Sequence, residues 1–218
     1  TSTATQTITI VDTEAPVIVL PAETVVDITC EEYVCGYQTG LAFQAGELSA
    51  AEAAAFIACT QDLFAVYDIL PLDVTDNCDD VEWEATSFFP IIHPECTTYE
   101  GSTNVKVSFV CYFNAIDDCG NAADSVYTVL NIIDNTDPVF VGVPVDTTAE
   151  CDEIDRTDVV IAMDDCDAEL PFNYEEIVSN EICTGSYTLT RTWSAVDACG
   201  NSAVATQVIT VVDTTDPV

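Results

Sequence analysis

The sequence predicts an all-β protein made of two consecutive β-sandwiches, with a short helical insertion in the first. The motif Cys-Gly-Asn at 119–121 recurs at 199–201, a spacing that suits a small β domain. Segments rich in Val, Ile, Thr and aromatic residues lie between turn-forming residues, as strands do. With 218 residues and 49% apolar content, the chain can bury one large core or two ordinary ones.

A repeated linker sets the module boundaries. The sequence DNTDP at 134–138 recurs as DTTDP at 213–217, and a related stretch, DTEAP, begins at Asp12. We therefore predict module one at 13–134, module two at 135–213, and a linker to a further module at 214–218.

Residues 1–12 match the end of module two, NSAVATQVITVVD, which predicts the last strand of a preceding or neighbouring module. Two explanations stay open. The chain is a segment of a longer tandem array, or this strand inserts into a neighbouring molecule and builds a polymer. In the second explanation, the residues of the inserted strand that would contact the neighbouring molecule are Thr5, Thr7, Ile8, Thr9 and Ile10.

The strands of each module follow from local patterns. Strands are predicted at 17–20, 103–116, 187–196 and 202–212. In YTLTRTWSAV, strict alternation places Leu189, Arg191 and Trp193 on one face of the strand. The sequences DDCGN and DACGN supply Gly-Asn turns between long strands, so each predicts a hairpin. Short strands, regularly spaced turns and Pro-marked linkers are typical of an immunoglobulin-like (Ig-like) sandwich.

The insertion in module one spans about 36–72, and its centre predicts a single helix. Ser49 with Glu52 three residues later forms a capping box. An apolar stripe at helical spacing follows, comprising Phe56, Cys59, Leu63, Val66 and Tyr67. We interpret the helix as packed on the sandwich, in preference to a cofactor-binding role.

The string YTLTRTWSAVDACGNSAVATQVITVVDTTDPV resembles the HYR-like, Ig-related repeats of bacterial extracellular adhesins and gliding-motility surface fibres. The resemblance covers nearly all of module two and most of module one outside the insertion. Module one departs from it at Phe113, where module two has Trp193, and in its insertion and three extra cysteines. The resemblance implies a role in cell-surface architecture and adhesion.

Charge and cysteine content limit the function further. The chain has 39 Asp and Glu against 3 Lys and Arg, a formal net charge of -36. Such a polyanion repels nucleic acid and anionic membranes and needs cations near clustered carboxylates. Eleven cysteines indicate an oxidising compartment, so we expect an extracellular or cell-surface location. No signal peptide and no stretch of 18 apolar residues is present in this sequence, so membrane insertion is not expected.

Strand direction predicts which cysteines share an end of each sandwich. Bridged Cα atoms lie within about 7 Å, whereas Cys183 and Cys199 would be separated by the length of a strand. The predicted pairs are Cys151 with Cys183, Cys166 with Cys199, Cys30 with Cys96, Cys78 with Cys119, and Cys35 with Cys59, the last pair anchoring the insertion. Cys111 is left over, as a buried thiol or an intermolecular bridge, and the mid-strand position favours burial.

The same directions gather acidic loops at the N-terminal end of each module. Calcium prefers six to eight oxygen ligands from carboxylates, amides and main-chain carbonyls, which these loops offer. We therefore predict calcium sites there, although Asp and Asn also commonly cap turns. The candidate ligands are Asp12, Glu14, Asp76, Asp79, Asp117, Asp118 and Asn121 for module one, Asp134, Asp137, Asp164, Asp165, Asp167, Asp197 and Asn201 for module two, and Asp213 in the last linker.

We expect no enzyme, because His93 has no Ser or Cys partner in a recognisable motif and no phosphate-binding Gly loop occurs. The predicted function is a segment of a fibre or adhesin stalk that associates with itself and is stiffened by calcium and disulfides. The alternative is a calcium-dependent carbohydrate-binding module that recognises surface glycans. Its candidate aromatic residues are Trp83, Phe88, Phe89, Tyr99 and Tyr112.

Overall fold

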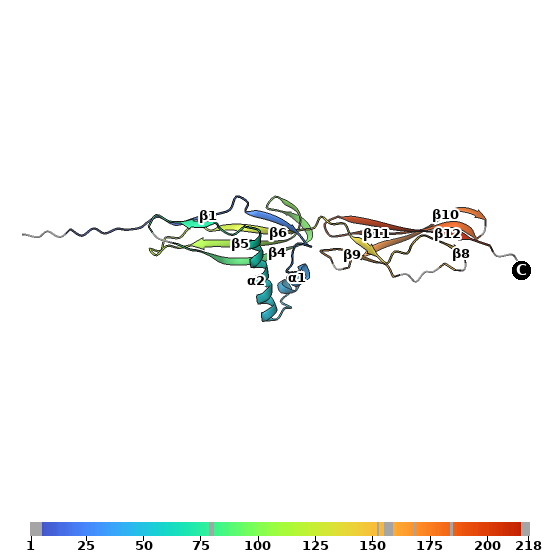
Figure 1. Ribbon diagram of the computed structural model, residues 1–218, viewed down its shortest axis with the longest axis horizontal. Coiled ribbons are helices and arrows are strands. Elements are labelled where there is room, and N and C mark those ends of the chain that lie inside the picture. The colour runs from blue at the N-terminus through green and yellow to red at the C-terminus, as the bar shows by residue number, and fades with distance from the viewer. Residues whose placement is uncertain are drawn as a thin grey trace, which may run out of the picture.

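The computed structural model describes residues 6–78, 81–151, 153–154, 159–167, 169–183 and 185–214, without the side chains of 37–38, 87–89 and 182–183. The chain is mostly β. Its strands fall into two groups that share no sheet among these residues, and we keep the names module one and module two for them. The two groups lie end to end along the longest axis of the molecule, and the helices stand to one side of module one (Figure 1).

Module one contains a four-stranded and a two-stranded sheet. The larger sheet has the order β2 (Val25–Thr29), β6 (Val126–Ile133), β5 (Ser102–Ala115), β4 (Trp83–Tyr99). The smaller sheet pairs β1 (Val17–Val19) with β3 (Asp73–Thr75). All pairs are antiparallel except β2 with β6, which run parallel. The parallel pair places the loop after β2 and the linker after β6 at the same end of the module.

Module two repeats this arrangement strand for strand. Its larger sheet has the order β8 (Thr147–Glu150), β12 (Ser202–Val212), β11 (Ser186–Val196), β10 (Phe172–Cys183). Its smaller sheet pairs β7 (Val139–Val141) with β9 (Ile161–Met163). Again only the first pair, β8 with β12, is parallel. Each strand of one module therefore has a structural equivalent in the other.

The insertion forms two helices, so the prediction of a single helix is wrong. The unpredicted helix is α1 (Tyr37–Ala45), which ends at Gly46 with φ of 72°, a conformation that favours glycine. The predicted one is α2 (Ala50–Val66). Its capping box forms as predicted, since the Ser49 hydroxyl accepts from the Glu52 N–H and the Glu52 carboxylate accepts from the Ser49 N–H.

The buried face of α2 is rotated from the predicted stripe. Its buried residues are Phe56, Thr60, Leu63 and Phe64, whereas Val66 is 69% exposed. Thr60 can be buried because its hydroxyl donates to the Phe56 carbonyl and lies 3.3 Å from the Tyr33 hydroxyl. This face packs on the sandwich core, where the rings of Phe56 and Phe109 are 6.3 Å apart.

Replacing Ser49 with alanine should destabilise α2 by about 0.5–2 kcal/mol, because the N–H groups of its first turn lose their acceptor. Amide hydrogen exchange in α2 would measure the loss. Ser49→Asp is the matched control, since aspartate also caps a helix. Equal exchange in the alanine and aspartate variants would contradict the assigned role of the hydroxyl.

Module two has smaller apolar clusters than module one, split by a polar layer. The guanidinium of Arg191, only 3% exposed, lies between Trp193 and Leu189 on the inward face predicted from alternation. It donates to a carboxylate oxygen of Glu176 at 3.0 Å and to the side-chain carbonyl of Gln207 at 3.1 Å. These bonds satisfy a charge that would otherwise be costly to bury.

Residues 6–12 lie outside any strand and extend away from module one at the end opposite to module two (Figure 1). Ile8 and Ile10 are 74% and 87% exposed. Thr5 lies outside the described residues. Strand donation by this segment therefore stays a prediction, supported by its apolar exposure and its match to β12.

Candidate functional site

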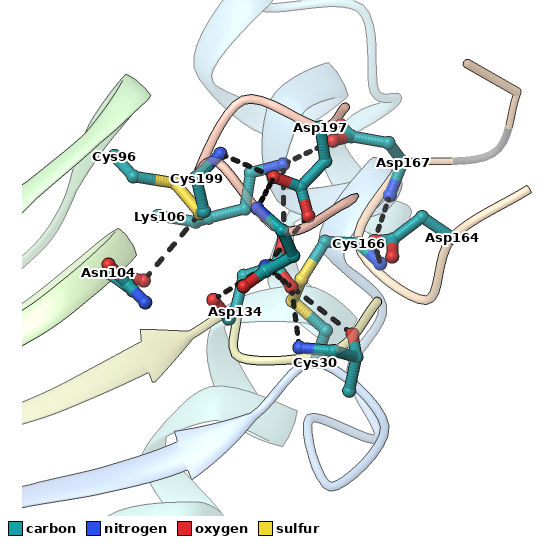
Figure 2. Close-up of polar contacts among 12 residues, drawn as sticks. Cys30, Cys96, Asn104, Lys106, Asp134, Asp164, Cys166, Asp167, Asp197 and Cys199 are labelled. Carbon is teal, nitrogen blue, oxygen red and sulfur yellow. Dashed lines mark hydrogen bonds and ion pairs between the residues drawn. A yellow bond between two sulfur atoms is a disulfide. The ribbon is translucent and has the colours of Figure 1, made fainter. Parts of the chain in front are cut away.

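Two disulfides cross the junction between the modules, which corrects the predicted pairing. Cys30 is bonded to Cys166, and Cys96 to Cys199 (Figure 2). The predicted Cys30–Cys96 and Cys166–Cys199 bonds, each within one module, are wrong. Strand direction had correctly placed one pair at the C-terminal end of module one and the other at the N-terminal end of module two. The error lay in treating each module separately, because the two ends face each other.

The other predicted pairs have different outcomes. Cys35 is bonded to Cys59 as predicted, tying the loop before α1 to α2. Cys78 and Cys119 are exposed, and their predicted bond stays a prediction. The Cys183 side chain lies outside the described residues, so its predicted bond to Cys151 stays a prediction. Cys151 itself is exposed.

Cys111 lies in the buried part of β5, with 4% of its surface exposed. Burial raises the pKa of its thiol to about 11, because a charged thiolate would be poorly solvated there. The side chain therefore behaves as a small apolar core residue with low reactivity.

Two clusters of carboxylates form at equivalent places in the two modules. The N-terminal cluster consists of Asp12, Asp76 and Asp117, whose ligand atoms all lie within 4.8 Å of one another. The junction cluster consists of Asp134, Asp164 and Asp197, and it lies beside the two junction disulfides (Figure 2). In each cluster the three residues come from the linker, the loop that follows the second short strand (β3 or β9), and the Cys-Gly-Asn hairpin. The predicted convergence of three acidic loops is thus what the structure shows.

The same local hydrogen bonds orient the carboxylates in both clusters. One oxygen of Asp12 accepts from the Glu14 N–H, and one oxygen of Asp164 accepts from the Cys166 N–H, at 3.1 and 2.9 Å. Asp134 and Asp76 make the corresponding bonds to the residue two positions on. These turns are typical of aspartate. They occupy Oδ1 of each carboxylate, so Oδ2 faces the cluster.

The hairpin aspartates are held more firmly. The Asp197 carboxylate accepts from the backbone and side-chain N–H groups of Asn201 at 2.9 and 2.7 Å. The Asn201 amide nitrogen also donates to the Asp134 carbonyl at 3.2 Å, which ties the hairpin to the linker. Asp117 and Asn121 repeat the first two bonds, with Asp12 as the linker residue. Both asparagines therefore donate hydrogen bonds that connect loops. Their predicted role as oxygen ligands stays a prediction.

Several carboxylate oxygens in these clusters are buried without a hydrogen bond from any described residue. They include Oδ2 of Asp12, Asp134 and Asp164. Two oxygens bound to one calcium ion at about 2.4 Å lie at most about 4.8 Å apart. The spread of the N-terminal cluster is within that limit. The Cys166 sulfur also lies close to Asp134 and Asp164, but its disulfide excludes it as a thiolate ligand. The oxygen donors fit a hard divalent cation such as calcium.

The electrostatics of the junction cluster favour a cation. Burial raises the pKa of Asp134, and the neighbouring Asp164 and Asp197 charges add to this effect. Burial also raises the pKa of Asp164, despite the N–H groups it accepts from. For Asp117, burial is the largest effect and acts upward, but the hydrogen bonds from Asn121, Cys119 and Gly120 together lower the pKa.

These shifts predict how the metal-free protein responds to pH. The pKa values of Asp134 and Asp164 are higher in the folded state than in the unfolded state. At a pH between the two values the folded state therefore binds more protons than the unfolded state, and the stability of the fold falls as the pH rises through this range. In EDTA, the Tm should therefore rise as the pH is lowered from neutral toward the raised pKa values. Asp134→Asn should show a smaller rise. A Tm rise of the same size in both proteins would contradict this assignment.

The remaining predicted ligands lie apart from the cluster centres. The Glu14 carboxylate accepts from the Asn77 amide at 2.7 Å, and the Asp137 carboxylate accepts from the Ser202 N–H at 3.3 Å. Asp118 and Asp165 make no contact with either cluster that the structure describes. Asp213 follows β12 at the opposite end of module two, where its N–H donates to the Ser186 hydroxyl. Asp79 lies outside the described residues.

Lys106 is the residue of this site that sequence reasoning missed. It is 1% exposed, and its ammonium lies 2.7 Å from Asp167 Oδ2 and 3.8 Å from Asp134 Oδ2 (Figure 2). It projects from module one into the acidic end of module two. The signal was available, since the chain has only 3 Lys and Arg and this one interrupts the apolar run NVKVSFV. Because Asp197 and Asp164 are also present, the described part of the junction carries more carboxylates than its one ammonium neutralises.

The remaining catalytic and aromatic candidates are part of the sheet structure. His93 Nε2 lies 3.3 Å from the Ser108 hydroxyl, but Ser108 is fully buried and its hydroxyl donates to Asn131. Trp83 packs edge-on against Phe113 in the core cluster. Tyr112 and Tyr127 are a half-exposed cross-strand pair, and Tyr99 packs on His93. The side chains of 88–89 lie outside the described residues.

No protein-family model matches the chain, and no curated protein matches it. Among solved structures, the chain is similar to the crystal structure of Drosophila N-cadherin EC1-3, with 12% identity and a TM-score of 0.26. The match covers 66% of this chain and 60% of the cadherin chain, less than two thirds of the latter. A likeness this distant says nothing about binding or function. Neither described helix has the length and hydropathy needed to span a bilayer.

Proposed function

We propose that this chain is a structural segment of an extracellular fibre or adhesin stalk, in which Ig-like modules are joined end to end and stiffened by calcium and by disulfides. The observation that carries the proposal is the junction, where two disulfides and one acidic cluster link consecutive modules. The resemblance to HYR-like repeats supports the same role. The disulfides also support a secreted or surface location.

The calcium role follows from charge and geometry. Asp134 belongs to the linker, whereas Asp164 and Asp197 belong to loops of module two. Without a divalent cation, their mutual repulsion and burial are opposed, among the residues that the structure describes, by the ammonium of Lys106. A calcium ion bound to the buried Oδ2 atoms would neutralise the carboxylates and hold the linker against the module. Linker motion relative to module two would then be restricted.

The N-terminal cluster would act in the same way on the preceding linker. Asp12 precedes β1 as Asp134 precedes β7, and both make the same Asx turn. Among the described residues, no lysine or arginine lies beside Asp12, Asp76 or Asp117. We therefore expect the N-terminal cluster to depend on calcium more strongly than the junction cluster.

Small-angle X-ray scattering, with and without a calcium chelator, tests the proposal. In calcium, the chain should scatter as one rod whose length matches two modules end to end. In chelator, residues 6–12 and the linker regions should take up more variable positions relative to the modules, and the Tm should fall. Magnesium in place of calcium is the control, because it demands stricter octahedral geometry. A Tm and scattering curve indifferent to chelation would overturn the calcium role.

Carbohydrate binding is the competing function, and a glycan array decides between the two. The half-exposed Tyr112 and Tyr127 pair is the aromatic surface that could stack on a sugar ring. Calcium-dependent binding to an array that is lost in Tyr112→Ala would favour a lectin-like module. A stalk segment is expected to bind no glycan on the array while keeping its calcium-dependent Tm.

A further inference from the structure

Lys106 is the only lysine in this sequence, and a β-bulge in β5 presents it to the junction. Val107 lies opposite Ile132 of β6, but Val105 lies opposite the next residue, Ile133, so Lys106 is an extra residue in the strand. A bulge of this kind re-aims a side chain. The equivalent strands of module two, β11 and β12, pair without a register shift. The position of the ammonium therefore depends on a feature that these strands of module two lack.

The ammonium is hydrogen-bonded to one carboxylate and lies near a second. Its Nζ is 2.7 Å from Asp167 Oδ2, which is a hydrogen-bonded ion pair. Its distance to Asp134 Oδ2 is 3.8 Å, too long for a hydrogen bond. Asp134 is 1% exposed, and its Oδ2 accepts no hydrogen bond from any residue that the structure describes. The ammonium thus attracts this oxygen electrostatically and leaves it available as a metal ligand.

The ammonium and a calcium ion would share the charge of the same carboxylate. A divalent cation on Asp134 Oδ2 would repel an ammonium 3.8 Å from that oxygen, and the repulsion is strong because the site is buried. Asp167 offers the ammonium another partner, and its side chain is 26% exposed to solvent. The ammonium can therefore move away from Asp134 and keep its hydrogen-bonded carboxylate.

The N-terminal cluster provides a comparison within the same chain. It lies at the end of module one opposite to the junction (Figure 1). The single lysine of the sequence is at the junction and cannot serve both clusters. The two clusters have equivalent carboxylates but differ in this built-in cation.

We propose that Lys106 is a built-in substitute for calcium at the junction, which neutralises the junction cluster when calcium is absent and competes with calcium for Asp134 when it is present. The inference rests on the proposed function, because it requires calcium at the junction cluster. The competition is reciprocal, so calcium weakens the attraction between Asp134 and the ammonium by the same free energy. As the calcium concentration falls, the junction cluster should lose its ion first but keep a counter-cation.

Calorimetric titration of Lys106→Met tests the competition. The titration is done in Asp12→Asn protein, which lacks the N-terminal cluster, so that it reports on the junction alone. The calcium affinity should rise about 10-fold or more, because close charge pairs at interfaces interact strongly enough for that change. The Tm in EDTA should fall, because the junction carboxylates lose their counter-charge. A purely structural role of Lys106 predicts that both the affinity and the Tm fall.

The single lysine also permits a direct observation on the unsubstituted chain. With nitrogen-15 in the lysine side chain, the protein should give one ammonium signal in its NMR spectrum. Calcium should shift this signal, because the ammonium leaves Asp134 and pairs with Asp167 alone. Asp134→Asn, which alters the junction cluster, should show a much smaller shift. This measurement does not depend on the folding of a lysine variant.

Two further variants make the result specific. Gln61→Glu makes the net charge more negative by the same amount on the exposed face of α2 and should leave the junction affinity unchanged. Lys106→Gln is a second neutral variant, whose amide can still donate to Asp167, and it should behave as Lys106→Met does. Circular dichroism would establish that the variants fold.

The results separate this inference from the proposed function. If calcium binds at the junction but the two neutral variants bind it no more tightly, or the lysine signal does not move, the competition is refuted and the calcium role stands. An equal rise in Gln61→Glu would likewise refute it, because general charge would then explain the effect. If Asp12→Asn protein binds no calcium, the calcium role of the junction fails, and this inference fails with it.

Discussion

Replacing Cys30 and Cys166 with serine is expected to lower the free energy of unfolding by about 4–5 kcal/mol in the chain-entropy model, because the bond closes a loop with a sequence separation of 136 residues. Guanidinium denaturation would measure the loss as a lower transition midpoint. X-ray scattering should show a second effect, a broader distribution of lengths, because one of the two covalent links between the modules is gone.

The Cys35→Ser, Cys59→Ser double variant is the matched control. It also removes one disulfide, but its loop has a sequence separation of 24 residues and lies within module one. A loss of about 3–4 kcal/mol is expected from the same model. The scattering curve should stay that of a straight rod. If both double variants scatter identically, or if peptide mapping links Cys30 to Cys96, the cross-junction assignment is wrong.

Calcium should raise the Tm, and Asp134→Asn should remove most of the part contributed by the junction. At a calcium concentration about 100 times its Kd, one site contributes about 2.7 kcal/mol. For a chain of this size, that corresponds to about 5–10 °C in Tm. The substitution removes the charge and one buried oxygen ligand, and keeps an acceptor for the Thr136 N–H.

Two further substitutions make this result specific. Asp12→Asn should remove the contribution of the N-terminal cluster. Calorimetric titration should therefore find one calcium site fewer in Asp12→Asn, and one fewer in Asp134→Asn, than in the unchanged protein. Asp62→Asn changes the net charge equally on the exposed face of α2 and should leave calcium binding unchanged. Equal losses in all three variants would show that calcium acts through general charge screening, and not through the clusters.

The sequence predicts the local features of this protein well. Period-two alternation placed Arg191 and Trp193 on the inward face of β11, and the capping box located the start of α2 at Ser49. Both depend on residues close together in the chain. Helix α1 was missed because its sequence, YQTGLAFQA, contains a glycine and has no capping side chain.

The candidate site was predictable only where strand direction determines position. Direction brought Asp12, Asp76 and Asp117 to one end of module one, since it fixes the end of the sandwich at which each loop lies. It could not decide between partners that meet across a junction, so Cys30 and Cys166 were assigned to different bonds. The choice depends on how two modules dock, which hydrophobic patterns within one module do not encode.

The Cys30–Cys166 bond changes how the chain would respond to a pulling force applied at its two ends. The shortest covalent path from Asp12 to Thr214 runs through the sulfur atoms and bypasses residues 31–165, which include both helices and strands β4, β5 and β6 of module one. Tension therefore bears only on the first 30 residues and on those after 165. Even if β2 were separated from β6, most of module one would carry no tension. The end-to-end distance of the chain would then increase little before the covalent path was fully extended.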